Sequence, residues 1–473
     1  MIDYKGIGFK AGLEVHQQLE GRKLFCHCPT IHSEREDFVI ERELRVSASE
    51  TGKIDVAAAF ELAKGKRFVY HGSYDSCCLV ELDEEPPHSI NEVALDTALM
   101  ISMLLKAKIT QELHVMRKIV IDGSNVAGFQ RTMLIARNGM LDTSSGPVRI
   151  NSICLEEEAA QKIKEDNEKV EYSLDRLGIP LIEIATEADI KNAEHAKEVA
   201  ALLGMILRST ERVKRGLGTI RQDINVSVKN GPKVELKGFQ DLRSITKVIE
   251  KEVERQSKLF EVGKLVSEVR KVEDDFSTTF VRPMPGAERM YPETDIEPIR
   301  VTDMMLKIIK TPELISEKSL RLESSYGLKT ELASELIKEK IDFESFVKRF
   351  KNIEPEFLAR TLVETPKDIK KRYKLNMPRK LIEEILSYLN EGKITKSAVE
   401  ELLINSSRTG KIEKIDIIQF RPVSDKELEQ IIKSVIERNK GAPLNALMGE
   451  AMKELRGRVD GKRVMELIKK FSL

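Results

Sequence analysis

The 473-residue sequence contains no tryptophan, has only five cysteines and shows no excess of charge of either sign. Lysine plus arginine and aspartate plus glutamate number 78 each, so any surface for nucleic acid must be local. An odd number of cysteines, partly adjacent, does not fit the disulfide framework of a secreted domain. No apolar run approaches the length of a membrane span, and the N-terminus lacks the apolar core of a signal peptide. These absences predict a soluble, cytoplasmic protein.

The length of the chain predicts several domains, because a single compact core does not grow to this size. Up to about residue 300, extended alternating stretches are mixed with helical ones. After Pro298 the sequence is rich in leucine, glutamate, lysine and isoleucine, with prolines at 312, 355, 366 and 378 where helices could begin. We therefore predict an α+β fold with a largely antiparallel sheet in a mixed domain at 1–299, an all-α domain at 300–405 and a small all-α tail at 411–473.

Individual elements of the first domain follow from residue spacing. Apolar residues at helical spacing predict helices over 192–208 and 245–260. Ser89 followed by Glu92 is typical of a capping box and predicts a helix that extends to about Lys106. Alternating stretches predict strands at 219–228, 233–238 and 278–282.

The stretch from Phe9 to Leu19 alternates strictly between apolar and polar residues, which predicts a half-buried strand. Glu14 and His16 then lie two residues apart on its polar face, close enough to share one cation. A carboxylate with an imidazole suits a divalent ion such as Mg²⁺ or Mn²⁺. Such a pair is more often a surface salt bridge, so the metal hypothesis requires further buried carboxylates to converge on it.

Two further carboxylates lie in apolar surroundings. Alternation along the strand places Glu157 on the same face as Ile153 and Leu155, and Glu183 is flanked by isoleucines. An ionised carboxylate is not buried without a partner, because desolvation costs several kcal/mol or raises its pKa. Each therefore needs a metal ion, a basic partner or a proton, and an internal ion pair is as good an explanation as a metal.

Candidate phosphate ligands follow in the sequence. Arg117 and Lys118 end an extended run, and a glycine-bearing segment from Asp122 to Arg131 comes next. Glycines there let backbone N–H groups approach a phosphate, although a plain surface loop is the commoner explanation. The residues that we predict for ATP or phosphate are Arg117, Lys118, Ser124, Arg131 and Arg221, the last on a polar strand face that is either a site wall or solvated.

Four of the cysteines suggest a zinc site, Cys26 and Cys28 with Cys77 and Cys78. The spacing of the first pair is acceptable. Adjacent ligands at 77 and 78 are strained, because successive side chains diverge in a strand. The sequence therefore favours a protein without zinc.

No Ser-His-Asp order, glycosidase carboxylate pair or Gly-x-Gly-x-x-Gly motif occurs, so no nucleophile is evident. Several motifs, however, resemble the family of E subunits of archaeal glutamyl-tRNA(Gln) amidotransferases, in order along essentially the whole chain. The bacterial B subunits share the Gly-Leu-Glu-x-His, Leu-Glu-Glu and Pro-Leu-Ile-Glu-Ile elements of this sequence but not its IDGSN segment. The motifs are GLEVHQQL (12–19), KLFC (23–26), LVELDEEPP (79–87), IDGSN (121–125) with GFQRT (128–132), GLGTIRQD (216–223) and RPMPGAERMYPETD (282–295).

The resemblance implies a catalytic cradle domain that binds Mg²⁺ through His16, Glu157 and Glu183, with Glu14 beside them. It implies ATP-dependent phosphorylation of glutamate mischarged on tRNA(Gln), followed by attack of ammonia. The ammonia would come through a tunnel from an asparaginase-like partner subunit, GatD, in a heterotetramer, which explains the missing nucleophile. The family usually carries an aspartyl-tRNA-synthetase-like insertion before the RPMPGA segment, and residues 272–277 leave no room for it here.

The resemblance also implies a YqeY-like tail that binds tRNA. From Lys440 to Leu473 there are eight basic and four acidic residues, and a net charge of +4 on a helical tip suits an RNA backbone. A solvated basic face is the alternative. The candidate tRNA-binding residues are Lys453, Arg456, Arg458, Lys462 and Arg463.

Two other functions fit parts of the pattern. A non-catalytic RNA-binding subunit could keep the fold, but it would not need the acidic cluster, and Glu14, His16, Glu157 and Glu183 are all present. A free-standing metal hydrolase would show no activity that needs both ATP and charged tRNA.

Overall fold

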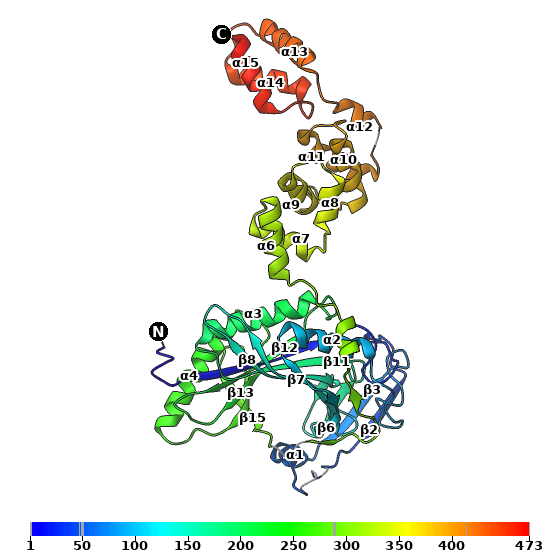
Figure 1. Ribbon diagram of the computed structural model, residues 1–473, viewed down its shortest axis with the longest axis vertical. Helices are drawn as coiled ribbons and strands as arrows, with labels where there is room; N and C mark the ends of the chain where they lie inside the picture. The colour runs from blue at the N-terminus through cyan, green and yellow to red at the C-terminus, as the bar shows by residue number, and fades with distance from the viewer. Residues whose placement is uncertain (1, 47, 49–51, 287–289, 413, 473) are drawn as a thin grey trace. The chain divides into compact units, whose positions relative to one another are not determined.

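The computed structural model describes residues 2–46, 48, 52–286, 290–412 and 414–472 (Figure 1). Residues 287–289 of the RPMPGAERMYPETD motif lie outside this range. The chain divides into two compact units, Met1–Leu314 and Ile315–Leu473. The first unit extends past residue 299 because Met305, Leu306, Ile309 and Leu314 pack against its core.

Eleven strands of the described chain form the main sheet of the first unit, and β13 with β14 is its parallel pair. The α+β prediction with a largely antiparallel sheet is therefore confirmed. In spatial order the path is β15 (Thr278–Pro283), β14 (Glu268–Val272), β13 (Val234–Lys237), β12 (Ile220–Ser227), β1 (Lys10–Gln18), β11 (Pro180–Thr186), β8 (Val148–Glu157), β7 (Phe129–Leu141), β6 (Val115–Ile119) and β16 (Met290–Pro292), with β4 (Lys108–Ile109) paired to β7.

The two faces of this sheet differ in chemistry. Helices α2 (Glu92–Leu104), α3 (Ala193–Ser209) and α4 (Ile245–Glu261) contact β7 and β8, β1, and β12 respectively (Figure 1). Leu13, Val15, Leu155 and Ile182 point to this side and are almost fully buried. Because side chains alternate along a strand, Glu14 and His16 are placed on the opposite face.

The predicted strands at 219–228, 233–238 and 278–282 and the helices at 192–208 and 245–260 appear within one or two residues of their expected ends. The capping box was wrong. Asn91, not Ser89, is the N-cap of α2, and its side chain accepts a hydrogen bond from Ala94 N at 3.2 Å. The Asn91 amide also donates to Arg22 O at 2.8 Å, so tertiary contact decides where the helix begins.

Smaller elements flank the main sheet. Two short sheets have the orders β2 (Phe38–Arg42), β3 (Arg67–Gly72), β10 (Lys169–Ser173), β9 (Gln161–Glu165), and β17 (Ile299–Arg300), β5 (Glu112–Leu113). Helices α1 (Val56–Leu62) and α5 (Asp303–Ile308) complete the unit. The four-stranded sheet packs Phe68, Tyr70, Val170 and Tyr172 into a core of its own.

The described part of the second unit is helical and holds two separate hydrophobic cores, one built around Leu358 and Ile385 and one around Ile432 and Val464. Pro355 begins α9, as predicted, but Pro366 lies inside that helix and does not start another. No described helix is long and apolar enough to span a membrane. The helices are α6 (Ile315–Tyr326), α7 (Thr330–Lys338), α8 (Phe343–Arg349), α9 (Pro355–Tyr373), α10 (Arg379–Asn390), the 3₁₀ turn η2 (Lys396–Ala398), α11 (Val399–Thr409), α12 (Lys414–Gln419), α13 (Asp425–Arg438), α14 (Leu444–Leu455) and α15 (Gly461–Ser472).

Candidate active site

The polar face of the main sheet brings together three of the predicted metal ligands. His16 on β1 lies directly opposite Glu183 on β11 in the antiparallel register. His16 Nε2 is 3.3 Å from Glu183 Oε2 and 3.9 Å from Glu14 Oε1. All three side chains are partly exposed, and ligand atoms of the three lie within 4.8 Å of one another. Two carboxylates and one imidazole at this spacing fit a divalent cation that prefers oxygen and nitrogen ligands.

Strands β8, β7 and β6, which follow β11 in the sheet, extend this cluster. Lys118 on β6 forms ion pairs with Glu156 of β8 and, at 3.6 Å, with Glu183 Oε2. The Thr132 hydroxyl on β7 also donates to Glu156. The cluster thus consists of Glu14, His16, Glu183, Glu156 and Lys118, all on the face away from the helices. It combines possible cation ligands with a lysine that can meet an anion.

The expected convergence of Glu157 with His16 and Glu183 is corrected by the strand register. Glu183 pairs with Cys154, so the even-numbered residues of β8 share its face, and Glu157 points to the other side. There its carboxylate accepts from Arg131 N at 3.3 Å and lies 3.4 Å from Arg131 Nη1. Glu157 is therefore partnered by an arginine, the internal ion pair that the sequence left open.

Sequence reasoning missed Glu156, although a signal was present. Ile153 and Leu155 face the core, so their even-numbered neighbours must face away from it. Ile182 and Ile184 likewise direct Glu183 away from the core. Because Glu156 and Glu183 each lie next to residues that face the core, alternation along the strands predicts that both side chains lie on the polar face.

The pKa values of two carboxylates in the cluster, Glu14 and Glu156, are raised, because of burial and because the positive charge nearby does not balance their negative charge. Burial and the nearby Glu183 raise the pKa of Glu14 to about 7. Burial also raises the pKa of Glu156, with Glu183 adding to the effect. Burial acts on Glu183 in the same direction, but Lys118 and His16 outweigh it and hold the pKa of Glu183 below its usual range. A carboxylate that keeps a proton near neutral pH would be stabilised in its ionised form by a cation bound beside it.

The phosphate candidates fall on both faces of the sheet. Arg221 lies opposite His16 on the polar face and donates to Glu158 Oε1 at 2.9 Å. Lys118 is part of the cluster. Arg117 and Arg131 lie on the other face, and Ser124 donates through its hydroxyl to Asp122 Oδ1 at 2.6 Å in the loop before β7. Lys118 and Arg221 are thus the two candidates placed on the same face as His16.

Arg117 and Arg131 are held by Glu293, a residue that the sequence did not single out. Glu293 Oε1 is 2.6 Å from Arg117 Nη2 and Glu293 Oε2 is 2.8 Å from Arg131 Nε. The Glu293 side chain is 0% exposed. The guanidinium groups of Arg117 and Arg131 also lie over the ring of Phe129 at 4.6 and 5.2 Å. This network ties the segment after β16 to β6 and β7.

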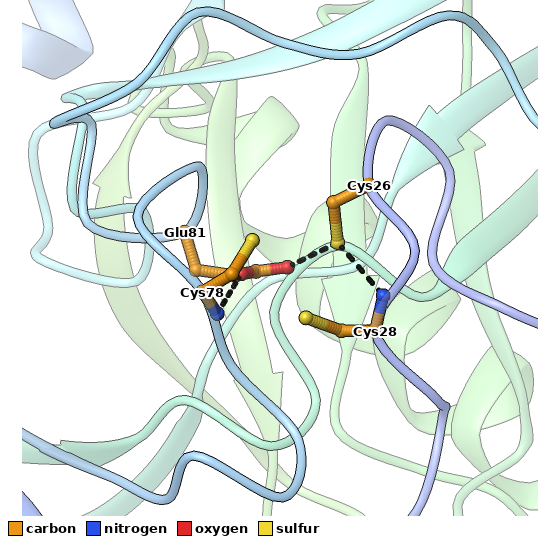
Figure 2. Close-up of side chains that lie close together, drawn as sticks. All are labelled: Cys26, Cys28, Cys78 and Glu81. Atoms are coloured by element: carbon orange, nitrogen blue, oxygen red, sulfur yellow. Dashed lines mark hydrogen bonds between the residues drawn. The ribbon is translucent and has the colours of Figure 1, made fainter.

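The cysteines gather differently from the prediction. Cys26, Cys28 and Cys78 meet Glu81, and ligand atoms of the four lie within 4.8 Å of one another (Figure 2). Cys77 is not in this group. Its buried thiol lies instead beside Lys23 Nζ at 3.9 Å and Ser76 Oγ at 3.5 Å. The divergence of adjacent side chains therefore removes Cys77, and Glu81 takes the fourth position.

The candidate tRNA ligands of the tail are on the surface of the second unit, and four of the five have acidic partners. The pairs are Lys453 with Glu450 at 2.7 Å, Arg456 with Glu401 at 3.4 Å, Arg458 with Glu427 at 3.0 Å and Arg463 with Asp425 at 2.8 Å. Exposed pairs of this kind are worth only about 0–1 kcal/mol, so a phosphate could displace them.

Comparison with known proteins gives the family context of this geometry. Residues 9–307 match the model of the GatB/GatE catalytic domain and residues 341–471 match a GatB domain. Similar proteins, each named as the E subunit of glutamyl-tRNA(Gln) amidotransferase, come from Methanocaldococcus jannaschii (37% identical over 623 positions, covering 99% of each chain) and Sulfurisphaera tokodaii (35% over 628 positions, 99% of each). A further one comes from Methanosarcina barkeri (35% over 621 positions, 99% of this chain and 98% of the other).

The aligned length also bears on the missing insertion. The 623 aligned positions with the Methanocaldococcus protein exceed the 473 residues of this chain, so at least 150 of them have no counterpart here. This agrees with the expected absence of an inserted domain. The polar cluster on the main sheet lies entirely within the match to the catalytic domain. The chain belongs to the GatB/GatE family.

Proposed function

We propose that this chain is the transamidating subunit that converts Glu-tRNA(Gln) into Gln-tRNA(Gln) with ATP and ammonia. The observation that carries the proposal is the group of Glu14, His16 and Glu183 on one face of the sheet, with Lys118 beside it. This group lies within the part of the chain that matches the GatB/GatE catalytic domain. The names of the relatives point to the same reaction.

The reaction needs an activated carboxylate, because a free carboxylate has no good leaving group. In the proposed first step an oxygen of the glutamate γ-carboxylate attacks the terminal phosphorus of ATP, and ADP leaves with the electrons of the broken P–O bond. Ammonia then attacks the acyl carbon, the C–O bond breaks and inorganic phosphate leaves. The nitrogen loses its extra proton to solvent, which gives the amide.

The side chains of the polar face have distinct parts in this proposal. Glu14, His16 and Glu183 hold a divalent cation, Mg²⁺ in the first instance. When bound, the cation neutralises charge that develops between the phosphates. Lys118 supplies a positive charge next to it, and Arg221 orients an anionic group from the neighbouring strand. The remaining phosphate candidates, Arg117, Ser124 and Arg131, are engaged in carboxylate contacts and stay predictions.

The ammonia would come from a partner. We propose an asparaginase-like subunit, GatD, that deaminates glutamine and delivers ammonia through a tunnel, in a heterotetramer with this chain. The proposal rests on the family and on the sequence, which offers no nucleophile of its own.

The test is an amidation assay with purified chain, Glu-tRNA(Gln), ATP, Mg²⁺ and ammonium. We expect Gln-tRNA(Gln) and one ADP for each amide formed. Glutamine should replace ammonium only when the asparaginase-like partner is added. Binding of tRNA without any ATP-dependent amide formation would contradict the proposal and favour a non-catalytic RNA-binding subunit.

The tail provides a separate prediction about tRNA. A triple variant with Lys453→Ala, Lys462→Ala and Arg463→Ala should weaken tRNA binding about tenfold, because phosphate contacts release counterions. The slope of log K against log salt should become shallower by about 2–3. Filter binding at several salt concentrations measures both quantities.

A matched triple variant provides the control for the tail. Lys329→Ala with Lys338→Ala and Lys351→Ala changes three exposed lysines of the same unit, outside the tail, and should retain the affinity. Equal affinities and slopes for the two triple variants would refute the role of the tail.

A further inference from the structure

A concentrated positive charge lies in the second unit where α9 ends and α10 begins. Residues 367–380 contain seven basic residues and one acidic residue, Asp368, which gives a net charge of +6. The segment from Lys440 to Leu473 is more than twice as long and reaches only +4. All seven basic side chains are exposed: Lys367, Lys370, Lys371, Arg372, Lys374, Arg379 and Lys380. We call residues 367–380 the α9–α10 surface.

The fold brings the two parts of this surface together. Lys367, Lys370 and Lys371 stand at positions i, i+3 and i+4 of α9, so they share one face of that helix. Lys374 caps α9, and α10 begins five residues later at Arg379. The two helices contact each other (Figure 1) and line a groove of about 490 Å³. Its lining is apolar at Leu362, Val363, Met377 and Ile382 and basic at Lys367, Lys370 and Arg379.

Most of this charge is not neutralised within the chain. Lys367 pairs with Glu335 and, at 3.3 Å, with Glu339, and Arg372 pairs with Asp368 at 3.1 Å. The other five side chains form no ion pair with a carboxylate of the described residues; they are Lys370, Lys371, Lys374, Arg379 and Lys380. In the tail, by contrast, four of the five candidate residues have acidic partners. The α9–α10 surface can therefore meet an anion without first breaking ion pairs.

Helix stability does not account for all of these cations. The macrodipole favours positive charge in the last turn of a helix, which suffices for Lys370 and Lys371. Arg379 and Lys380, however, lie in the first turn of α10, where the positive end of the dipole opposes them and no acidic residue compensates. Lys367 and Lys371 also repel each other across one turn. A bound anion would relieve these repulsions.

From these observations we propose that the α9–α10 surface binds the sugar-phosphate backbone of RNA. An acidic peptide held in the groove would need cations only along its lining, whereas Lys371, Lys374 and Lys380 lie outside that lining. A backbone that carries a charge at every nucleotide meets cations both in the groove and beside it. The identity of the RNA as tRNA rests on the proposed function. The surface would add a second contact region to the one predicted in the tail.

A triple variant of the full chain with Lys370→Gln, Arg379→Gln and Lys380→Gln tests the proposal. Binding of tRNA should weaken about tenfold, and the slope of log K against log salt should become shallower by about 2–3, because three phosphate contacts are lost. The Tm of the second unit should stay the same or rise by about 1–3 °C, since two of the charges oppose the dipole of α10. A role in folding alone predicts the reverse, a lower Tm with unchanged affinity, which would overturn the proposal.

A matched triple variant changes lysines elsewhere in the same unit. Lys329→Gln, Lys348→Gln and Lys351→Gln alter three exposed lysines that also form no ion pair with a described carboxylate and do not line the groove. This control should keep the affinity and the salt slope of the unaltered chain. Equal losses of tRNA affinity in the two triple variants would show that position within the unit does not matter, and would overturn the proposal.

Two further measurements identify the ligand. Acetylation of Lys371 and Lys374 should be slower with tRNA bound, whereas Lys348 should react at an unchanged rate; equal protection of all three would refute the assigned surface. Poly-glutamate serves as the probe for an acidic protein segment. A variant at 370, 379 and 380 that loses affinity for poly-glutamate but not for tRNA would overturn the proposal in favour of a protein partner. The binding assays do not require catalysis, so the loss of tRNA affinity would still support this surface in a chain that forms no amide.

Discussion

A Glu183→Gln variant is expected to lose ATP-dependent amidation by about a thousandfold, roughly 4 kcal/mol of transition-state stabilisation. The carboxylate of Glu183 lies 3.3 Å from His16 Nε2 and 3.6 Å from Lys118 Nζ. It is a proposed ligand of the cation, and it also contacts both of these basic side chains. An amide keeps the shape of the side chain but loses its charge. The amide is a weaker ligand for a hard cation, and it no longer balances the positive charge of Lys118 and His16.

The loss should appear in kcat, because the proposed cation acts on charge that develops in the transition state. The affinity for Glu-tRNA(Gln) should stay within about twofold, since the carboxylate is not expected to contact the RNA backbone. Rapid-quench measurement of ADP formation and tRNA filter binding give the two quantities. Glu165→Gln is a suitable control, because Glu165 is an exposed strand carboxylate that pairs with Lys66 at 2.6 Å in another sheet. An active Glu183→Gln enzyme would remove the basis of the proposed function.

The same assay distinguishes Glu183 from Glu157, which the sequence had grouped together. Glu157 faces Arg131 on the opposite side of the sheet. A Glu157→Gln variant should therefore affect amidation only by disturbing the packing of Arg131, and not by removing a ligand of the proposed cation. If Glu157→Gln lost activity with unchanged thermal stability, the register argument for Glu156 would need revision.

The second large effect is expected from Glu293→Ala, which should lower the stability of the first unit by about 3–5 kcal/mol. Glu293 accepts from two arginines, Arg117 and Arg131, while its own side chain is fully buried. It also accepts from Asp295 N at 3.1 Å. Removing it leaves two guanidinium groups close together without their shared partner, and burial makes that arrangement costly.

Differential scanning calorimetry of the full chain measures this change as a fall of about 5–10 °C in the transition of the first unit. Asp189→Ala is the matched control. Asp189 also receives two hydrogen bonds from one arginine, Arg149, at 2.9 and 2.8 Å, but that arginine is largely exposed. Exposed pairs contribute about 0–1 kcal/mol, so the control should move the transition by about 2 °C or less. Equal shifts in the two variants would show that the Glu293 network is not a buried anchor.

The α+β class and most element positions could be predicted from the sequence, because these follow from local patterns. The alternation from Phe9 to Leu19 predicted β1, and it placed Glu14 and His16 on one face as the structure does. Helical spacing predicted α3 and α4 within one residue at their starts. The start of α2 was missed because Asn91 is held by a contact to Arg22, which lies far away in the sequence.

Tertiary structure alone decided which distant residues meet. The pairing of β11 with β8 placed Glu156 beside Glu183 and turned Glu157 toward Arg131, since a shift of one residue exchanges the faces of a strand. The fold likewise exchanged Cys77 for Glu81 in the cysteine group and buried Glu293 between two arginines from other strands. Local periodicity determines the face on which a side chain lies relative to its neighbours, whereas partners across strands and turns depend on register and chain path, which no local pattern contains.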